Sequence, residues 1–210
     1  MIIPQTNESL GEIVNTITRG GIIAFRTDTF YGLGTDPFNR EAVQRIKQLK
    51  GREDAQPILI LISDREQIDR FISDSSTTFD LLGKIFWPGP LTLICKATAE
   101  VPEEITAGTE TIGVRLPADV RVRALVQACG GALTATSANP SHQQPAKSAQ
   151  EVFNYFGDAV DLIVDGDVAE TDRPSTVVNA CGDEPSLVRE GAILWSKIQS
   201  AIHQITEDPS

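Results

Sequence analysis

The sequence contains few of the residues that most often build metal sites, disulfides and acid–base catalytic centres. Among 210 residues there are three cysteines and two histidines. The cysteines, Cys95, Cys129 and Cys181, are odd in number and far apart, and no Cys-x-x-Cys pair occurs. We therefore expect no disulfide framework and no protein-held zinc or other metal, and a reducing compartment fits best.

The chain also has no long hydrophobic run and no recognisable targeting segment. No stretch approaches the roughly 18 apolar residues that a membrane helix needs. Residues 1–10 lack the basic start and the apolar core of a secretory signal. These absences predict a cytoplasmic protein that makes no membrane contact.

Positive charge is scarce as well. The chain has 18 lysines and arginines against 29 aspartates and glutamates, which gives a formal net charge of -11 and a pI near 4.6. This balance argues against a protein whose main task is to bind nucleic acid through a broad basic surface. It leaves room for a small, local anion site.

Three common active-site signatures are missing too. No glycine-rich run ends in Gly-Lys-Ser/Thr, so the P-loop is absent, and residues 32–37 form only an incomplete GxGxxG. A Ser-His-Asp triad would have to use His142, and no GxSxG elbow presents a serine. His203 lies near the C-terminus, where we expect a surface position.

What the sequence does contain is a regular succession of short apolar segments. Helices are predicted in residues 10–17, 40–50, after Asp64, and in 77–86, 121–129, 149–156 and 193–202. Strands are predicted in residues 22–25, 58–62, 91–96, 111–116, 132–136, 162–164, 176–179 and 187–189. Several strands follow each other without room for a crossover helix, so we predict one α/β domain with a mixed parallel and antiparallel sheet.

Two cations, Lys50 and Arg52, stand one residue apart at the end of the second predicted helix, with Gly51 between them. An open backbone flanked by two cations suits an anion such as a phosphate or a carboxylate. A simpler interpretation is a helix C-terminus, which favours both cations and glycine. The residues alone leave both interpretations open.

Two further features also have a structural and a functional interpretation. Ser137 and Asn139 either cap a turn or present a hydroxyl and an amide to a ligand. Arg115 lies within an apolar strand. A buried arginine needs an anionic partner, which would be an internal aspartate such as Asp119 or Asp165, or else a bound ligand.

Seven motifs occur along the chain in a characteristic order. They are TDTFYGLGTD, K-x-R at Lys50 and Arg52, WPGPLTLI, TIGVRLP, S-x-N at Ser137 and Asn139, RPSTVV and LVREG. In this order they resemble the YrdC-like threonylcarbamoyl-AMP synthases, of the short, single-domain type. The resemblance predicts a YrdC-like domain in residues 8–193, with a C-terminal helix and a frayed tail in residues 194–210.

The resemblance implies a twisted, open α/β fold around a concave, locally positive cavity. It also implies the condensation of L-threonine, bicarbonate and ATP to threonylcarbamoyl-AMP with release of pyrophosphate, which is a nucleotidyltransferase reaction. Mg²⁺ would be carried by the ATP phosphates. A downstream threonylcarbamoyl transferase would then modify an adenosine in tRNA.

The resemblance assigns roles to particular residues of this chain. Lys50 and Arg52 match the motif that handles the ATP phosphates and the reacting carbamate, so they form the expected catalytic pair. The residues expected to bind threonine are Thr29, Arg115 and Ser175. The residues expected at the nucleotide are Lys50, Arg52, Gln56, Thr111, Ser137, Asn139, Pro145 and Arg189.

Three positions depart from the family's pattern. Arg26 stands where many members have proline, Gln56 where asparagine is frequent, and Leu61 where some members have histidine. Two alternatives to the synthase therefore stay open, a paralogue that uses another carbamoyl-type substrate and a module that binds double-stranded RNA weakly. The basic patch for RNA would consist of Arg40, Arg45, Lys47, Lys50 and Arg52.

Overall fold

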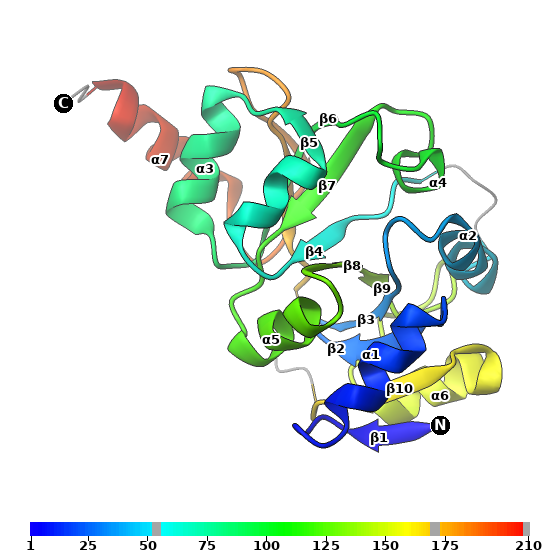
Figure 1. Ribbon diagram of the computed structural model, residues 1–210. Coiled ribbons are helices and arrows are strands. Elements are labelled where there is room, and N and C mark those ends of the chain that lie inside the picture. The colour runs from blue at the N-terminus through cyan, green and yellow to red at the C-terminus, as the bar shows by residue number, and fades with distance from the viewer. Residues whose placement is uncertain (52–55, 169–172, 208–210) are drawn as a thin grey trace.

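The strands of the protein form two sheets that meet in the middle of the molecule (Figure 1). The computed structural model describes residues 1–51, 56–168 and 173–207, with side chains up to residue 202. Within these residues one sheet has five strands and the other has seven. The seven-stranded sheet occupies the upper half of Figure 1 and the five-stranded sheet the lower half.

The five-stranded sheet joins the N-terminal segment to strands from much later in the chain. In spatial order its strands are β1 (Ile2–Pro4), β10 (Leu162–Asp165), β2 (Ile23–Arg26), β3 (Tyr31–Gly34) and β9 (Thr136–Ser137). β10 pairs in parallel with β1 and β2, whereas β3 is antiparallel to β2 and β9. β2 and β10 are largely buried because their continuous apolar sequences are covered on both faces.

The seven-stranded sheet is also mixed. Its path is β12 (Ser186–Arg189), β11 (Thr176–Asn179), β6 (Leu91–Ala97), β7 (Thr111–Arg115), β4 (Ile60–Ile62) and β8 (Ala132–Thr134), with β5 (Ile72–Asp74) paired to β6. The β11–β6 and β4–β7 pairs are parallel, and the other pairs are antiparallel. The predicted mixed α/β fold is confirmed, although the chain builds two sheets where one was expected.

Helices cover both sheets. They are α1 (Leu10–Thr18), α2 (Arg40–Leu49), α3 (Thr77–Phe86), α4 (Glu103–Thr106), α5 (Val120–Ala128), α6 (Ala149–Phe156) and α7 (Trp195–Glu207), with 3₁₀ turns at Arg65–Arg70 and Gly157–Ala159. α1 and α6 lie beside the five-stranded sheet, and α3 and α7 lie together beside the seven-stranded sheet (Figure 1). None of the helices in the described ranges is long and apolar enough to cross a membrane.

The two sheets are joined by consecutive residues of one segment. β8 belongs to the seven-stranded sheet and β9 to the five-stranded sheet, so only Ala135 separates them. The Ala135 N–H donates to the carbonyl of Leu59, which precedes β4 of the seven-stranded sheet. The Thr134 N–H donates to the carbonyl of Thr35, which follows β3 of the five-stranded sheet. Backbone hydrogen bonds therefore fix the junction from both sides, and the loops nearby are held to it.

The end of α2 agrees with the simpler interpretation of its cations. Asn39 caps the N-terminus, where its side chain accepts a hydrogen bond from the Ala42 N–H. The helix ends at Leu49, and Gly51 has a positive φ of 64°, the left-handed conformation that commonly ends helices. Arg52 lies outside the described residues, so its predicted role is not addressed by the geometry.

Several short strands escaped the sequence prediction. No strand was predicted for residues 31–34, which form β3, and β1, β5 and β9 were not predicted either. Gly32 and Gly34 give β3 a low intrinsic strand preference. Gly34 is nevertheless required there, because a Cβ would stand 2.6 Å from the Phe25 ring and 3.0 Å from the carbonyl oxygen of Thr134. Close approach of the two sheets overrides local propensity.

Candidate functional site

Arg115, the last residue of β7, carries a buried guanidinium beside the loop that follows β2. The residue is 3% exposed. Its Nη1 donates to Thr29 Oγ1 over 3.3 Å, and its Nη2 forms an ion pair with Asp28. Its Nε is buried and has no hydrogen-bond partner among the residues that the structure describes. One donor of the guanidinium fork is therefore available to a further acceptor.

The electrostatic surroundings of Arg115 favour an added anion. Burial, and next the positive charge of Arg189, lower the pKa of Arg115 to about 9. The guanidinium is therefore still charged at neutral pH. Burial also lowers the pKa of Arg189. Two arginines that repel each other where both are desolvated, with Asp28 paired to one of them, are stabilised by a second negative group.

The loop that carries Thr29 is held by its own hydroxyl groups. Thr27 Oγ1 donates to the Phe30 carbonyl over 2.7 Å and accepts the Thr29 N–H over 3.1 Å. The hydroxyl oxygens of Thr27 and Thr29 are 3.0 Å apart. Both threonines are buried, so Thr29 Oγ1 is fixed between Thr27 and Arg115.

Ser175 and Arg189 lie together on the other side of this site, at the start of β11 and the end of β12. Arg189 Nη2 donates to the Ser175 carbonyl over 2.9 Å and approaches Ser175 Oγ at 3.3 Å. Ser175 Oγ is also 3.0 Å from Thr92 Oγ1. Ser175 and Arg189, which carry no individual sequence signal, are thus brought together, and the hydroxyl groups of Ser175 and Thr92 form a buried pair.

A second group of predicted residues is formed by the loop that follows β9. Asn139 is 7% exposed, and its Nδ2 donates to the carbonyls of Pro140 and Gln143 at 2.9 and 2.7 Å. Its Oδ1 is buried and lacks a hydrogen-bond partner within the described part of the chain. A buried amide oxygen of this kind is suited to accept from the amino group of a ligand.

Lys50 contacts this loop from the end of α2. Lys50 is 2% exposed, and its Nζ donates to the carbonyls of Ser137 and Asn139, the latter over 2.9 Å. The Ser141 N–H in turn donates to the Lys50 carbonyl over 2.9 Å. The predicted catalytic lysine therefore supports the backbone of the S-x-N element in this structure.

The two groups of residues are linked through β3. The Tyr31 N–H donates to the Ala146 carbonyl over 3.0 Å, and the Ala138 N–H donates to the Tyr31 carbonyl over 2.8 Å. Thr29 lies two residues before this strand, and Pro145 is adjacent to Ala146 in the loop. The loop of residues 27–30 and the loop that carries Ser137 and Asn139 therefore form adjacent walls of one candidate site at the junction of the sheets.

Three predicted positions are less closely involved. Thr111 opens β7, so it stands four residues, or about 13 Å along an extended strand, from Arg115 at the other end. Gln56 is exposed at the start of the segment that leads to β4. Leu61 is 1% exposed and belongs to the apolar cluster beneath α1 and α5. A leucine at position 61 therefore serves packing in this chain.

Arg115 has an internal aspartate as its partner, but it is neither of the two named as examples from the sequence. Asp119 instead pairs with Arg26, and Asp165 accepts a hydrogen bond from the Tyr31 hydroxyl. The partner is Asp28, which follows Thr27 in the chain and was overlooked between two threonines. The sequence offered a signal for Asp28, because an acidic residue in a loop of hydroxyl groups is a candidate counter-ion for a buried arginine. Thr92, in an apolar strand, offered no such signal.

The proposed basic patch for RNA is largely neutralised. Arg40 Nε is 2.9 Å from Glu104 Oε2, and Arg45 Nη2 is 3.0 Å from Asp161 Oδ2. Lys47 and Lys50 are 6% and 2% exposed. Four of the five cations are thus paired or buried, so an RNA-binding module is not favoured.

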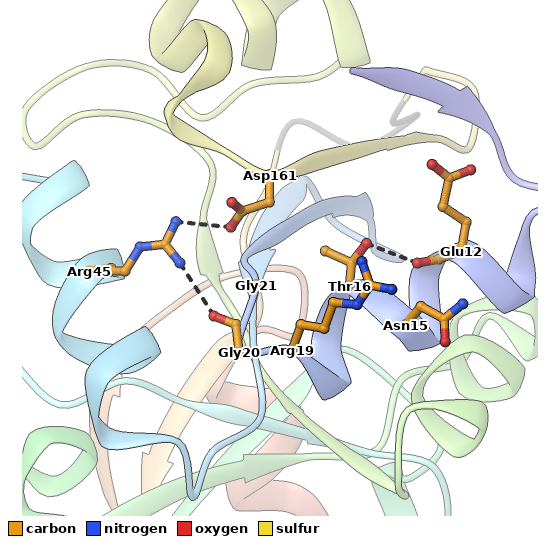
Figure 2. A pocket seen from close by; sticks show the side chains of 8 residues that line it. All are labelled: Glu12, Asn15, Thr16, Arg19, Gly20, Gly21, Arg45 and Asp161. Carbon is orange, nitrogen blue, oxygen red and sulfur yellow. Dashed lines mark hydrogen bonds and ion pairs between the residues drawn. The ribbon is translucent and has the colours of Figure 1, made fainter.

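A surface cavity lies outside the group of predicted site residues. It has a volume of about 480 Å³ and is bounded by the end of α1, Gly20, Gly21, Arg45 and Asp161 (Figure 2). Arg45 bonds both Asp161 and the Gly20 carbonyl there. The predicted site residues do not line this cavity. No group of three or more histidine, cysteine, aspartate or glutamate side chains able to hold a metal occurs in the described ranges.

Fold and site together define a class of protein. A mixed α/β scaffold places two partly desolvated arginines, buried hydroxyl groups and an unpartnered amide oxygen where two sheets meet. These groups suit a small ligand that carries an anionic group together with hydrogen-bonding groups.

The chain belongs to the Sua5/YciO/YrdC family, whose model, described as "Telomere recombination", matches residues 15–191. The threonylcarbamoyl-AMP synthase of Halorhodospira halophila is 36% identical over 161 residues, which cover 77% of this chain and 84% of that protein. The enzyme of the same name from Thiobacillus denitrificans is 40% identical over 164 residues, which cover 78% and 86%.

A solved structure of Sua5 from Pyrococcus abyssi complexed with L-threonine has the same fold. The TM-score is 0.92 and the sequence identity is 32% over 96% of this chain. The match covers 61% of the P. abyssi chain, so this chain spans about three fifths of that relative.

Proposed function

We propose that this protein is a threonylcarbamoyl-AMP synthase, a nucleotidyltransferase that makes threonylcarbamoyl-AMP and pyrophosphate from L-threonine, bicarbonate and ATP. The observation that carries the proposal is the buried Arg115 fork, which has an unpartnered Nε beside Thr29 and lies close to the charge of Arg189. It is supported by relatives that bear this name and by the related structure complexed with L-threonine.

The amino-acid half of the site uses charge and hydroxyl groups. The threonine carboxylate accepts from the open Nε of Arg115, and the guanidinium supplies the opposite charge. Thr29 and Ser175 contribute hydroxyl groups nearby, each already oriented by a neighbour. Such fixed donors lower the entropic cost of holding the reacting amine in place.

The chemistry needs little covalent help from the protein. The threonine amine combines with bicarbonate to give a carbamate and water. A carbamate oxygen then attacks the α-phosphorus of ATP, the bond from that phosphorus to the bridging oxygen breaks, and pyrophosphate leaves. Arg52, Thr111 and Arg189 belong to the nucleotide side of this proposal. Positioning and neutralisation of the phosphate charge are the main contributions of the chain.

Lys50 and Asn139 shape the nucleotide side. Lys50 fixes the carbonyls of the S-x-N element, so that Asn139 keeps one amide oxygen available to the nucleotide. Mg²⁺ is carried by the ATP phosphates, where it offsets their charge. The proposal also includes a cytoplasmic location and a downstream transferase that moves the threonylcarbamoyl group to tRNA.

One assay tests the proposal directly. The protein is incubated with ATP, bicarbonate, Mg²⁺ and either threonine, serine or glycine, and pyrophosphate is measured. We expect release that depends on threonine and bicarbonate together, and we expect an Arg52→Ala protein to release it more slowly. Pyrophosphate release that ignores the amino acid would contradict the proposal.

A further inference from the structure

Arg26 makes a partly buried contact that connects the loop of residues 27–30 to the beginning of α5. It is the last residue of β2 and directly precedes Thr27. Its Nη1 is 3.2 Å from Asp119 Oδ2, and the two side chains are only 13% and 17% exposed. A pair with so little exposure is screened by salt much less than a surface pair. Position 26 thus fixes the origin of the loop.

A second ion pair of opposite polarity lies beside the first. Asp28, on the loop, pairs with Arg115, and its Oδ2 accepts the Ala118 N–H over 3.2 Å. The loop therefore contributes one cation and one anion to residues 115–119, which contribute one anion and one cation in return. Two pairs of reversed polarity fix the register of two segments better than one pair can, because a shift along the chain brings like charges together.

Residues 117–119 form a rigid support for this contact. Asp119 Oδ1 caps α5 by accepting the Arg121 N–H over 2.8 Å. Arg123 Nη1 donates to the carbonyls of Pro117 and Ala118 at 2.7 and 2.8 Å. Because this turn is itself fixed to α5, the position of Arg26 follows that of the helix.

The other side of Arg26 is closely packed as well. A Cβ built at Gly166 would stand 3.1 Å from the Arg26 Cβ, so the chain after β10 passes directly over it. The neighbouring Tyr31 hydroxyl accepts the Gly166 N–H over 3.1 Å. The arginine is therefore enclosed between α5 and this turn.

We infer that Arg26 and Asp119 form a positioning pair for the amino-acid half of the site, holding the 27–30 loop so that Thr29 stays in contact with Arg115. The pair acts through Thr29 and Arg115 and touches no substrate itself. This inference rests on the proposed function, since the ligand whose binding it supports is threonine. A small displacement of the loop lengthens the 3.3 Å contact between Arg115 and Thr29 and so misplaces the guanidinium that holds the threonine carboxylate.

The test uses Arg26→Met and Asp119→Asn, singly and together. Methionine retains an unbranched apolar stem, and asparagine retains the helix cap while removing the charge. We expect the KM for threonine to rise about fivefold in either single variant, with kcat and the KM for ATP close to those of the unchanged protein. The double variant is expected to show little further rise beyond Asp119→Asn, because both changes remove the Arg26–Asp119 pair, while Asp119→Asn also removes the longer 3.8 Å pair with Arg121.

Arg45→Met is the matched control. It removes another inter-element ion pair, with 3.0 Å between Arg45 Nη2 and Asp161 Oδ2, at the cavity shown in Figure 2. This variant should leave the KM for threonine unchanged. A rise equal to that of Arg26→Met would mean that loss of any such pair suffices, and the inference would be wrong.

Amide hydrogen exchange provides a readout that does not require activity. Arg26→Met should speed exchange at the Thr27 and Thr29 amides, which are hydrogen-bonded within the loop, and leave β6 unchanged. An unchanged KM for threonine in an active Arg26→Met protein overturns the inference and leaves the proposed function standing. Absence of threonine-dependent pyrophosphate release from the unchanged protein overturns both.

Discussion

Arg115 combines two requirements that normally conflict, since it is a permanent charge and yet is almost inaccessible to water. The conflict is resolved locally by Asp28, which forms an ion pair with Nη2, and by Thr29, whose hydroxyl accepts from Nη1. The remaining Nε lacks a partner in the part of the chain described. A residue satisfied on two sides and open on the third is poised for an anion rather than for a structural role alone.

Substitutions at Arg115 should separate binding from folding. Arg115→Lys keeps the charge and loses the planar fork, so we expect the KM for threonine to rise by on the order of tenfold, which corresponds to one charge-assisted hydrogen bond. Arg115→Met leaves Asp28 without its cation and should lower the free energy of unfolding by about 3 kcal/mol. Steady-state kinetics and urea unfolding measure the two effects. A fully active Arg115→Met protein would exclude the clamp.

Lys50 is expected to act on the nucleotide through the loop that it supports. Lys50→Met removes hydrogen bonds to two carbonyls and should lower the free energy of unfolding by about 2 kcal/mol while raising the KM for ATP. Lys47→Met is the matched control, since Lys47 lies one turn earlier on α2 and is similarly buried. Equal effects of the two substitutions on the KM for ATP would contradict this assignment.

The cysteines should differ in reactivity with pH. Burial raises the pKa of Cys129 to about 12, and burial also raises the pKa of Cys95 and Cys181. A raised pKa reduces the thiolate fraction, which is the reactive form. Cys181 alone of the three is exposed, so iodoacetamide should label it first as the pH rises from 7 to 9. Mass spectrometry measures the labelling of each cysteine. Cys129 should stay unlabelled, and its early modification would contradict the burial argument.

At the scale of elements, β3 determines how closely the sheets approach. Gly34→Ala would place a methyl group against the Phe25 ring and the Thr134 carbonyl, so we expect the free energy of unfolding to fall by about 2 kcal/mol. Gly11→Ala is the matched control, because nothing lies within 4 Å of a Cβ there and alanine favours the helix α1. Urea denaturation of both variants makes the comparison. A destabilisation by Gly11→Ala as large as that by Gly34→Ala would show that loss of a glycine alone is harmful.

Helices and buried strands were predictable because their signals are local. Apolar periodicity located α1, α2, α5 and α6, and Asn39 and Ser148 accept capping hydrogen bonds at the starts of α2 and α6. Continuous apolar runs located β2 and β6. The short strands β1 and β9 were missed because three or two residues carry no usable period, and pairing with distant strands creates them.

The candidate site was predictable only in part. The motif order identified Thr29, Arg115, Ser175 and Arg189, which the structure brings together through direct bonds or electrostatic coupling. The spacing of those motifs could not show that Lys50 donates to backbone carbonyls. A side chain's partner depends on the three-dimensional path of a loop almost 90 residues away, which only tertiary packing determines.

At the scale of the whole molecule, charge should limit interaction with RNA. With a formal net charge of -11 and with Arg40 and Arg45 already paired, the protein should not bind a double-stranded RNA of about 20 base pairs measurably at physiological salt. Fluorescence anisotropy at increasing salt tests this. Micromolar binding with a steep salt dependence would restore the RNA-binding alternative.

The pairing of β1 with β10 has a consequence for synthesis on the ribosome. Ile2 lies opposite Ile163, and β10 also separates β1 from β2. More than three quarters of the chain must therefore leave the ribosomal tunnel before the first strand finds its neighbour. During that interval β2 lacks the strand that later pairs with its edge, so this unpaired apolar strand is a natural target for chaperones that bind nascent chains.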